Sequence, residues 1–470
     1  MADDFDIIVI GGGGAGMSAA WHAADQGASV MILEAAPKPG GATALSTGVV
    51  YAAGTTPQRA AGIEDSGEAM FHYLMTLNQW SIKPALARQL CDRGGTIIDW
   101  LIELGNEFPP DWIVCSGVDS TPRGHQSVGA GIGIAESLVN AIGAKGVEVA
   151  CQSRAENLIV ENGRVVGVSA AGTELRAKAV ILTTGGFGNN PALIRRLYPT
   201  AAVHGDRVFS VYKDAPFNLG DGIIMGERVG GNVTGINNGL LNPTPNFTQT
   251  PEGFLPAWAM IVNRDGQRFL PENAPYAISG YLINDQPEQR CFAIFDDATM
   301  REAASDDNPY RHYKNDPGSE NWRLSKILAN VDNGRVKVAD TLDELARRAD
   351  ISADTLRLTV ERYNADCAAG EDSLFFKTAA KLYPVSAAPF YAVEIRASMI
   401  GSTHAGLEID EHGHVVDVRG RIVEGLYAGG EVLGCTMGRR YIGGGIGIAN
   451  ALTFGRLSGL TAAREIREGG

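Results

Sequence analysis

The chain has 470 residues, 59 of them glycine, and a formal net charge of −14. This length suits two or three domains rather than one. The negative charge argues against nucleic acid as a partner, because nucleic-acid binding depends on clustered basic side chains. No apolar stretch reaches the about 18 residues of a membrane span, and the acidic start of the chain does not resemble a signal peptide. We therefore expect a cytoplasmic protein without a membrane span.

The cysteine and histidine pattern favours neither a disulfide framework nor a metal site. The six cysteines lie far apart and form no Cys-x-x-Cys pair, so reduced thiols are expected. His412 and His414 have the spacing of a metal-binding pair, but they lie in a predicted hairpin turn. No metal is predicted.

The first forty residues follow the order of a dinucleotide-binding unit. Residues 6–10 form a short β-branched run, typical of a buried parallel strand. An alanine-rich helix is predicted over 17–27, and a second strand over 29–34 ends in an acid. Between the first strand and the helix, the sequence fits G-x-G-x-x-G.

Each glycine of this motif has a physical role. Gly11 permits a tight turn, Gly13 lets the backbone approach a pyrophosphate, and Gly16 lets the helix pack on the strand. The helix N-terminus offers N–H donors and partial positive charge to the phosphates. Glu34 closes the second strand, where its carboxylate can accept hydrogen bonds from ribose hydroxyls. A dinucleotide without a 2′-phosphate is predicted, and NAD and FAD both satisfy this part of the pattern.

Three later segments are also rich in glycine. Residues 40–46 place Gly-Gly before small and hydroxyl residues, which suits a loop lying against a flat ring. Residues 179–188 form a predicted strand that runs into glycines, and 425–431 repeat this pattern with a final acid suited to polyol hydroxyls. Asn162-Gly163 predicts a hairpin turn, and Gly220 precedes a predicted helix.

In this order, the motifs resemble those of the FAD-dependent fumarate reductase and 3-ketosteroid dehydrogenase superfamily. The resemblance implies an α/β protein in which a Rossmann-like FAD-binding domain is split by an inserted α+β catalytic, or cap, domain. We place the FAD-binding domain at 1–235 and 390–470, and the catalytic domain at 236–389. Within the latter, Thr341 to Ala368 predicts two helices, with Ser352 as N-cap of the second.

The resemblance also implies that the cofactor is FAD. Non-covalent binding is expected, because no histidine lies in residues 40–46, where some relatives attach the cofactor. The residues expected to contact FAD lie in the glycine-rich segments and near the late helix: Gly11, Gly13, Gly14, Ala15, Gly16, Glu34, Ala35, Gly41, Ala42, Thr43, Ser46, Thr184, Gly185, Asp221, Gly430, Glu431, Gly447 and Ile448.

Three positions depart from the fumarate reductase pattern. Tyr441 stands where that pattern has an arginine for the substrate carboxylate, and Ser402 stands where it has a histidine. The cap segment carries Tyr276 and no arginine as proton donor. Since guanidinium groups are the preferred bidentate partners of carboxylates, these changes argue against a dicarboxylate substrate.

The same positions resemble the 3-ketosteroid dehydrogenases. By that resemblance, Tyr441 O–H and Gly445 N–H would bind a carbonyl oxygen, and Tyr276 would move the proton at the α-carbon. Removing an α-proton leaves enolate charge on oxygen, which preorganised donors stabilise most in the transition state. The predicted reaction is α,β-dehydrogenation of a 3-ketosteroid or another cyclic ketone, or the reverse ene reduction. An additional catalytic tyrosine is sought at Tyr51 or Tyr73.

His404, Arg440 and Trp258 are the expected substrate-contacting side chains. The expected partners are a small cyclic ketone or enone and an external electron acceptor or donor. Two alternatives stay open. The first is a carboxylate ene-reductase in which Arg439 or Arg440 binds the substrate. Together with Arg123, these arginines could also serve the carboxylate of a keto acid ring. The second is a flavin-binding electron carrier without turnover.

Overall fold

The computed structural model describes residues 4–213, 215–304, 306 and 319–469, and it divides into two compact units. The first unit comprises Met1–Ala202, Tyr212–Leu240 and Ser402–Gly470. The second comprises Val203–Val211 and Leu241–Gly401. The domain boundaries at 235/236 and 389/390 that the sequence suggests are not tested by this division into compact units, and they stay a prediction.

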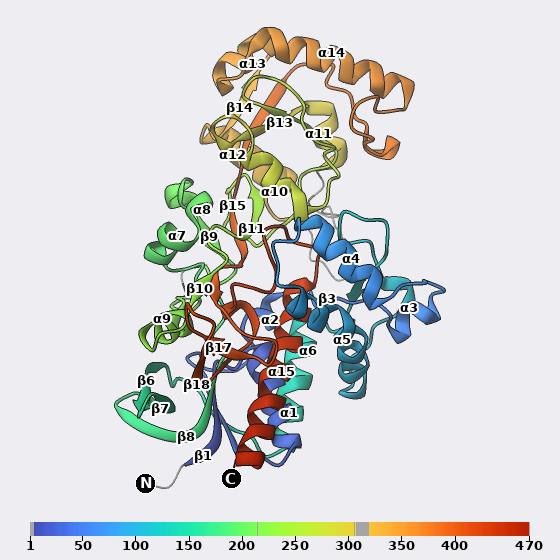
Figure 1. Cartoon of the computed structure of the whole chain (residues 1–470). Helices are drawn as coiled ribbons and strands as arrows, with labels where there is room; N and C mark the ends of the chain where they lie inside the picture. The colour runs from blue at the N-terminus through green and yellow to red at the C-terminus, as the bar shows by residue number, and fades with distance from the viewer. Residues whose placement is uncertain (1–3, 214, 305, 307–318, 470) are drawn as a thin grey trace. The chain divides into compact units, whose positions relative to one another are not determined.

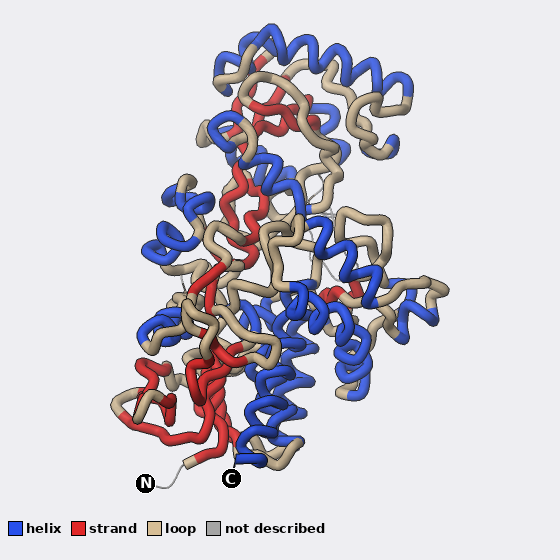
Figure 2. Tube along the Cα trace, viewed as in Figure 1, coloured by secondary structure: helices blue, strands red, loops and turns tan. Residues whose placement is uncertain are grey.

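The first unit is built on an eight-stranded, mostly parallel sheet (Figures 1 and 2). The main path runs β17-β18-β8-β1-β2-β5, and β6 and β7 join it through β8. The strands are β1 Phe5–Ile10, β2 Val30–Leu33, β5 Glu148–Ala150, β6 Ala155–Glu161, β7 Arg164–Ala170, β8 Thr173–Leu182, β17 His414–Val416 and β18 Ile422–Ala428. The two early predicted strands are confirmed. So is the hairpin turn, in which Asn162 and Gly163 both have positive φ.

Helices pack against this sheet through close backbone contacts. Helices α1, α6 and α15 run beside one another along the sheet in Figure 1. A Cβ at Gly455 or Gly459 would lie 2.1 or 2.2 Å from the carbonyl oxygens of Ala15 and Ala19 on α1, so only glycine permits this approach. The helices of the unit are α1 Gly14–Asp25, α2 Gly41–Leu45, α3 Thr56–Ala60, α4 Gly67–Leu77, α5 Pro84–Glu103, α6 Ala130–Ala144, α7 Pro191–Leu197, α8 Pro199–Ala202, α9 Asp221–Arg228 and α15 Ile446–Gly469.

Two small sheets complete the first unit. Strand β3 (Val49–Tyr51) pairs antiparallel with β4 (Gly124–Gln126), and β10 (Val233–Thr234) pairs with β16 (Gly406–Leu407). The predicted helix after Gly220 is confirmed as α9, and Gly220 adopts the left-handed conformation at its N-cap.

The second unit is an antiparallel sheet with helices, in agreement with the α+β class expected for the inserted part. Its main strands follow the order β11-β15-β13-β12, with β14 and β9 also paired to β15. Strands are β9 Phe209–Ser210, β11 Gly239–Thr244, β12 Met260–Asn263, β13 Cys291–Asp296, β14 Val336–Ala339 and β15 Phe390–Thr403. Helices are α10 Tyr276–Asn284, α11 Asp297–Ala303, α12 Leu324–Asp332, α13 Leu342–Ala349 and α14 Ala353–Ala369.

The two helices predicted over 341–368 are confirmed as α13 and α14, and they close one core of the unit. Leu345, Leu356 and Tyr363 pack against β12 and β13. Ser352 is the N-cap of α14, as predicted, but its side chain makes no capping bond to the backbone. Its hydroxyl instead lies 3.1 Å from Thr355 Oγ1. The helical start therefore depends on tertiary packing more than on this cap.

No helix in the described part of the chain combines the length and apolar character needed to cross a bilayer.

His414, the first residue of β17, pairs with two carboxylates, Asp410 just before the strand and Glu465 on the C-terminal helix. Its Nδ1 lies 2.8 Å from Asp410 Oδ2, and its Nε2 lies 3.0 Å from Glu465 Oε1. Tyr427 O–H donates to Glu465 Oε2 at 2.7 Å. Burial alone would lower the pKa of His414, but hydrogen bonds and charge from Asp410 and Glu465 raise it above its ordinary value. His414 thus serves as an ion-pair partner within this fold.

The contact predicts a specific pH dependence of stability. Because the folded-state pKa of His414 is raised, its contribution is complete below the unfolded pKa and is lost as pH rises through the folded pKa. Between about pH 6 and pH 9, the wild-type Tm should fall more steeply than the Tm of His414→Gln. Calorimetry of the two proteins across this range checks it, with His412→Gln as the matched control. Parallel Tm curves for wild type and His414→Gln would contradict the assignment.

Candidate active site

The loop between β1 and α1 has the shape that its glycines predict. Gly11 has φ +103°, and a Cβ there would lie 2.5 Å from the Thr183 carbonyl oxygen. A Cβ at Gly16 would lie 1.9 Å from the Gly11 carbonyl oxygen, so the start of α1 lies directly on the turn. At Gly13 the nearest atom to such a Cβ is 3.9 Å away. The backbone of Gly13 is therefore open to a close ligand, as a pyrophosphate would require.

Glu34 is held at the carboxyl end of β2 beside this loop. Its Oε2 accepts from Gly12 N–H at 2.7 Å, and its Oε1 accepts from Ala36 N–H at 2.7 Å. Each carboxylate oxygen has a second lone pair, so the group can accept ribose hydroxyls as well.

The segment 40–46 packs directly against the first loop. Gly40 N–H donates to the Gly12 carbonyl at 2.9 Å, and Thr43 is buried beside Gly14. The expectation of a plain loop is wrong, because Gly41–Leu45 form the short helix α2. Ser46 closes that helix by donating from Oγ to the Thr43 carbonyl at 2.8 Å.

Glu431 occupies a partly buried position between two other glycine-rich segments. Its Oε1 accepts from Thr403 N–H at 2.8 Å and from Thr403 Oγ1 at 3.0 Å. A Cβ at Gly186 would lie 2.3 Å from the same oxygen. Burial raises the pKa of the Glu431 carboxyl, and the Thr403 bonds only partly oppose this. A partly buried acid of this kind suits hydroxyl groups of a ligand better than a cation.

The remaining residues expected at the cofactor have varied environments. Asp221 Oδ2 lies 2.6 Å from an Arg154 nitrogen, and Thr184 Oγ1 accepts from Gly222 N–H at 3.0 Å. The other members lie on elements of the first unit: Ala15 in the first turn of α1, Ala35 after β2, Ala42 in α2, Gly185 after β8, Gly430 beside Ala15, and Gly447 and Ile448 in the first turn of α15. Their contact with FAD stays a prediction.

Tyr441–Gly445 form a loop that the rest of the first unit holds from one side. Tyr73 O–H donates to the Ile442 carbonyl at 2.9 Å. The Ser116 hydroxyl donates to the Gly444 carbonyl at 2.9 Å, and Gly444 N–H donates to the Ser116 carbonyl at 2.9 Å. Tyr51 N–H donates to the Gly445 carbonyl at 3.2 Å. The backbone of the loop is thus held by hydrogen bonds from neighbouring segments of the first unit.

Gly445 could not be another residue in this arrangement. Its φ is +100°, and a Cβ would lie 2.7 Å from the Val49 carbonyl oxygen. Among the described residues the structure records no acceptor for Gly445 N–H, although the neighbouring Gly444 N–H is bonded to Ser116. This donor stays available to a ligand at the start of α15, where the helix dipole adds positive potential.

His404 supports Tyr441 from behind. The two rings are stacked, with centroids 6.0 Å apart and planes inclined by 20°. The ring of His404 is 1% exposed, and burial lowers its pKa to about 4. Because the Gly438 carbonyl can only accept, Nδ1 carries the proton at 3.2 Å, and Nε2 accepts from Ser402 Oγ at 2.9 Å. His404 is a neutral ring at pH 7, which suits positioning rather than proton transfer.

Of the candidate arginines, Arg123 is excluded as a free carboxylate binder. It is 2% exposed, and its guanidinium lies 2.7 Å from Asp65 and 2.6 Å from Asp119. The expectation that Arg123 could hold a substrate carboxylate is therefore wrong. Arg439 and Arg440 are exposed, and Asn78 fixes the Arg440 backbone through bonds of 2.7 and 3.1 Å.

In the second unit, Tyr276 is the first residue of α10. Its ring meets Phe254 edge-on, with centroids 5.2 Å apart. Trp258 is 3% exposed and lies in a cluster with Phe295 and Trp322, at centroid distances of 5.0 and 6.2 Å. This environment is one of packing, and the role of Trp258 in substrate binding stays a prediction.

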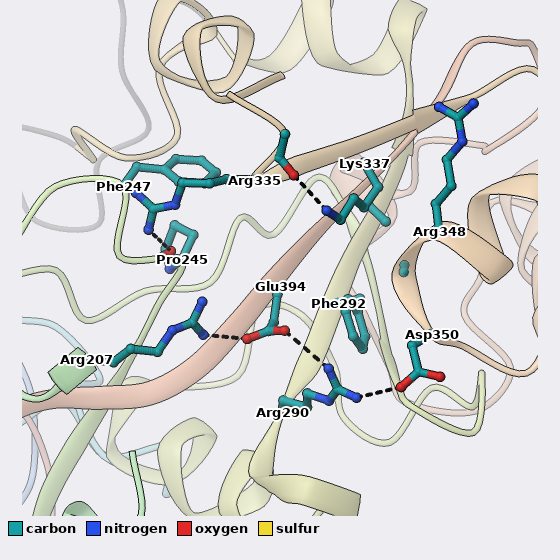
Figure 3. Close-up of a pocket in the computed structure, with 13 residues that line it drawn as sticks. Arg207, Pro245, Phe247, Arg290, Phe292, Arg335, Lys337, Arg348, Asp350 and Glu394 are labelled. Carbon is teal, nitrogen blue, oxygen red and sulfur yellow. Dashed lines mark hydrogen bonds and ion pairs between the residues drawn. The ribbon is translucent and has the colours of Figure 1, made fainter. Parts of the chain in front are cut away.

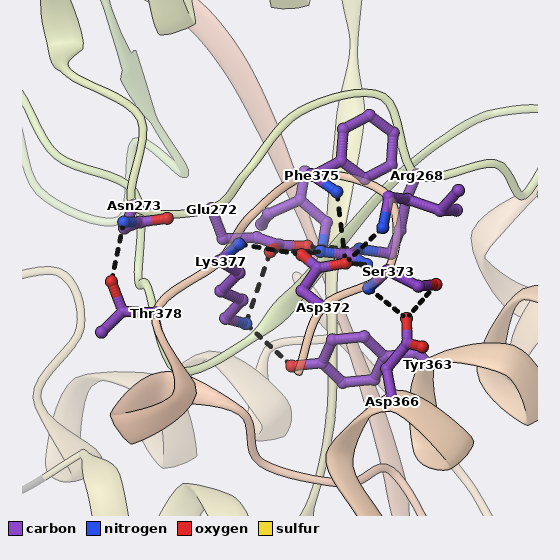
Figure 4. Close-up of polar contacts among 12 residues, drawn as sticks. Arg268, Glu272, Asn273, Tyr363, Asp366, Asp372, Ser373, Phe375, Lys377 and Thr378 are labelled. Atoms are coloured by element: carbon purple, nitrogen blue, oxygen red, sulfur yellow. Dashed lines mark hydrogen bonds and ion pairs between the residues drawn. The ribbon is translucent and has the colours of Figure 1, made fainter. Parts of the chain in front are cut away.

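A buried charge network holds the segment before Tyr276 (Figure 4). Arg268 lies 2.9 Å from Glu272 and 2.8 Å from Asp372, and all three side chains are almost fully buried. Lys377 Nζ donates to Tyr363 Oη at 2.8 Å and to the Ala259 carbonyl at 2.9 Å, and it lies 3.4 Å from Glu272. Glu272 also accepts from Ile261 N–H at 3.0 Å. The network therefore ties residues 268–272 to β12 and α14.

Sequence reasoning did not find this network. Arg268 and Glu272 stand four residues apart, which is a visible signal, but Asp372 and Lys377 are about a hundred residues further along the chain. Burial opposes ionisation of Asp372, yet hydrogen bonds and charge from Arg268 lower its pKa below the ordinary value. Burial lowers the pKa of Lys377. Only the fold brings these four groups together.

Comparisons with known proteins identify the family. A family model described as an FAD binding domain matches residues 6–448. The chain belongs to this family. It is 30% identical to a fumarate reductase (cytochrome) of Shewanella frigidimarina over 98% of this chain and 77% of that protein. It is 26% identical to a 3-oxosteroid 1-dehydrogenase of Mycobacterium tuberculosis, over 98% of this chain and 99% of the relative.

A solved structure agrees over nearly the whole length. The 3-ketosteroid-Δ4-(5α)-dehydrogenase of Rhodococcus jostii RHA1, in complex with 4-androstene-3,17-dione, has a TM-score of 0.78 and 26% identity, and the match covers 98% of each chain. The flavoprotein described here is thus an FAD-dependent oxidoreductase whose relatives are reductases and dehydrogenases of C=C or CH–CH bonds.

The first unit fits FAD on its own structural evidence. The open backbone at Gly13 and the carboxylates of Glu34 and Glu431 suit its phosphates, ribose and polyol chain. Asn450 on α15 is 1% exposed, and neither of its amide atoms has a partner among the described residues. An unpartnered buried amide is costly, so a bound polar group is the expected partner.

Asn450→Leu tests this fit. Without FAD, the variant should be as stable as the wild type or more stable, because the unpartnered amide is removed. The variant should bind FAD about tenfold more weakly than the wild type, because roughly one hydrogen bond to the cofactor is lost. Equilibrium dialysis of FAD and thermal unfolding of the apoprotein check the two parts. Unchanged FAD affinity together with a destabilised apoprotein would show that Asn450 has only a structural role.

Glu272→Gln tests the buried network. The substitution keeps the shape of the side chain but leaves Arg268 and Lys377 with less negative charge in a buried site. We expect a loss of about 3 kcal/mol in the stability of the second unit. Urea unfolding followed by tryptophan fluorescence measures it, since Trp258 and Trp322 both belong to that unit.

Arg301→Gln is the control for this substitution. Arg301 pairs with Asp297 at the exposed surface of the same unit, so its loss should leave the unfolding midpoint unchanged. Equal effects of the two variants would argue against a special role of burial.

Proposed function

We propose that this flavoprotein removes or adds two hydrogens across the α,β carbon–carbon bond of a cyclic ketone, with 3-ketosteroids as the first substrates to test. The observation that carries the proposal is the Gly445 N–H, which has no acceptor among the described residues and follows the rigid loop that bears Tyr441. Similarity to the steroid dehydrogenases of Mycobacterium tuberculosis and Rhodococcus jostii supports the choice of substrate class.

In this proposal, Tyr441 O–H and Gly445 N–H bind the ketone oxygen. When a proton leaves the α-carbon, negative charge grows on that oxygen, and two preorganised donors stabilise it most in the transition state. The bonds from Tyr73, Ser116 and Tyr51 hold the loop in place before substrate arrives. The stacked, neutral His404 fixes the Tyr441 ring without adding a charge that would compete for the oxygen.

Tyr276 is the group we assign to the α-proton. In dehydrogenation it takes this proton, and in ene reduction it returns it. Bound FAD supplies the hydride chemistry at the β-carbon. The external electron acceptor or donor that completes the cycle, the cytoplasmic location and the non-covalent attachment of FAD are parts of the same proposal.

A carboxylate ene-reductase is the second candidate, because Arg439 and Arg440 are exposed beside Tyr441 and Asn78 fixes the Arg440 backbone. The fumarate reductase of Shewanella frigidimarina, at 30% identity, supports it. It differs from the first candidate in the group that binds substrate, which is a guanidinium rather than a tyrosine hydroxyl.

Tyr441→Phe distinguishes the candidates. We expect the variant to keep FAD and to lose about 10²- to 10³-fold in kcat with ketones, as when one oxyanion donor is removed. Anaerobic loss of visible flavin absorbance with 3-ketosteroids and cyclohexanones, and reoxidation of the reduced protein by enones or fumarate, provide the readout. Tyr391→Phe is the matched control, because its hydroxyl binds Asp297 in the second unit.

The outcomes separate all three hypotheses. Turnover of ketones or enones that depends on Tyr441 supports the proposal. Reoxidation by fumarate alone, lost in Arg440→Gln but kept in Tyr441→Phe, would move the function to carboxylates. A protein that binds FAD and reacts with neither class would be a flavin-binding electron carrier.

A further inference from the structure

The second unit contains a cationic cavity that the proposed reaction does not use. Its volume is about 340 Å³, and it lies among β13, β14, β15 and the end of α13 (Figure 3). Five cationic side chains line it, against two carboxylates. The lining residues alone carry a charge of +3, in a chain whose net charge is −14. Two of the five cations also pair with carboxylates outside the lining, Arg348 with Glu344 at 2.5 Å and Arg290 with Glu288 at 2.7 Å. The unbalanced cations are therefore chiefly Arg335 and Lys337. Such a concentration of positive charge favours a bound anion.

The two carboxylates of the cavity are already shared among several guanidinium groups. Glu394 pairs with Arg207, with Arg290 at 3.4 Å and with Arg396 at 2.8 Å. Asp350 lies 2.9 Å from Arg290. Figure 3 shows Arg207, Glu394, Arg290 and Asp350 joined in one row. These carboxylates therefore cannot neutralise the other cations of the cavity.

Arg335 and Lys337 have no carboxylate within ion-pair distance among the described residues. Arg335 donates to the Asn246 carbonyl and, at 3.4 Å, to that of Pro245, and Lys337 donates to the Gly334 carbonyl at 2.7 Å. Arg335 immediately precedes β14 and Lys337 is the second residue of that strand, and both side chains line the cavity. Burial and the charge of Arg207 lower the pKa of Arg335. An anion there would relieve this repulsion.

Aromatic rings hold two of the guanidinium groups in position. Arg335 Cζ lies 5.4 Å from the centroid of Phe247, and Arg290 Cζ lies 5.6 Å from that of Phe292. Stacking of this kind leaves the N–H edge of the guanidinium free to donate. The donors are thus partly ordered before a ligand binds, which reduces the entropic cost of binding.

We infer that this cavity binds a small phosphate-bearing molecule. A phosphate group presents several acceptor oxygens and up to two negative charges, which suits the several cationic donors that line the cavity, Arg335 and Lys337 above all, better than one planar carboxylate does. The volume lies at the lower end of the range for small-ligand sites. Phe247 and Phe292 add apolar surface for the organic part of a phosphate ester.

The test is isothermal titration calorimetry of the FAD-loaded protein at low ionic strength. Pyrophosphate and AMP are the probes, and adenosine and succinate are the comparison ligands. We expect saturable one-to-one binding of both phosphate compounds, at least about tenfold tighter than succinate, and weaker binding as salt is added. Adenosine, which has no phosphate, should give no saturable heat.

Variants locate the binding. Arg335→Gln combined with Lys337→Gln should weaken pyrophosphate binding at least about tenfold, while Arg301→Gln, an exposed cation of the same unit, should leave it unchanged. Circular dichroism and flavin content confirm that the variants are folded. If the double variant does not fold, Lys337→Gln alone gives the test, because the one hydrogen bond of Lys337 Nζ within the described residues goes to a turn carbonyl.

Three results would overturn the inference. The first is the absence of saturable binding of either phosphate compound. The second is binding that the Arg335 and Lys337 substitutions leave unchanged. The third is equal affinity for pyrophosphate and succinate, which would show that the cavity selects charge but not phosphate. None of these results bears on Tyr441 or on ketone turnover, so failure here is distinguishable from failure of the proposed function.

Discussion

The close approach of backbone to backbone at a few glycines is the constraint on which the first unit depends. Gly16 lies on the turn at Gly11, and Gly455 and Gly459 lie on the carbonyls of Ala15 and Ala19. These contacts join the two ends of the chain, which are more than four hundred residues apart. As a result, the N-terminal dinucleotide loop and the late loop at Tyr441 belong to one packed unit.

The candidate active site is rigid because its hydrogen bonds are made by the backbone. The Tyr441–Gly445 loop is held by partners from β3, from α4 and from residues 116–117, all within the first unit. Gly445 supplies the remaining N–H donor of the loop. Its backbone has a positive φ, and there is no room for a side chain at this position. Preorganised donors of this type are the main source of electrostatic catalysis in enzymes that stabilise an oxyanion.

The second unit contains two contrasting arrangements of charged side chains. Around Arg268, buried cations and anions are matched, and each removed partner would leave an uncompensated charge. Around Arg335, cations exceed anions and face a cavity. The first arrangement stabilises the segment that leads to Tyr276, and the second is suited to an external ligand. Residue type alone does not distinguish the two, because both consist of Arg and Lys among Asp and Glu.

The sequence by itself determined the class of fold, the cofactor family and the positions of the glycine-rich loops. These are local properties, because strand, glycines, helix and acid follow one another within forty residues. Only the tertiary structure decided that Arg123 is neutralised by Asp65 and Asp119, that residues 41–45 form a helix, and that Arg268 meets Asp372. The reason is physical: the partner that satisfies a buried charge is chosen by the packing of distant segments, and no local pattern records which charges will meet.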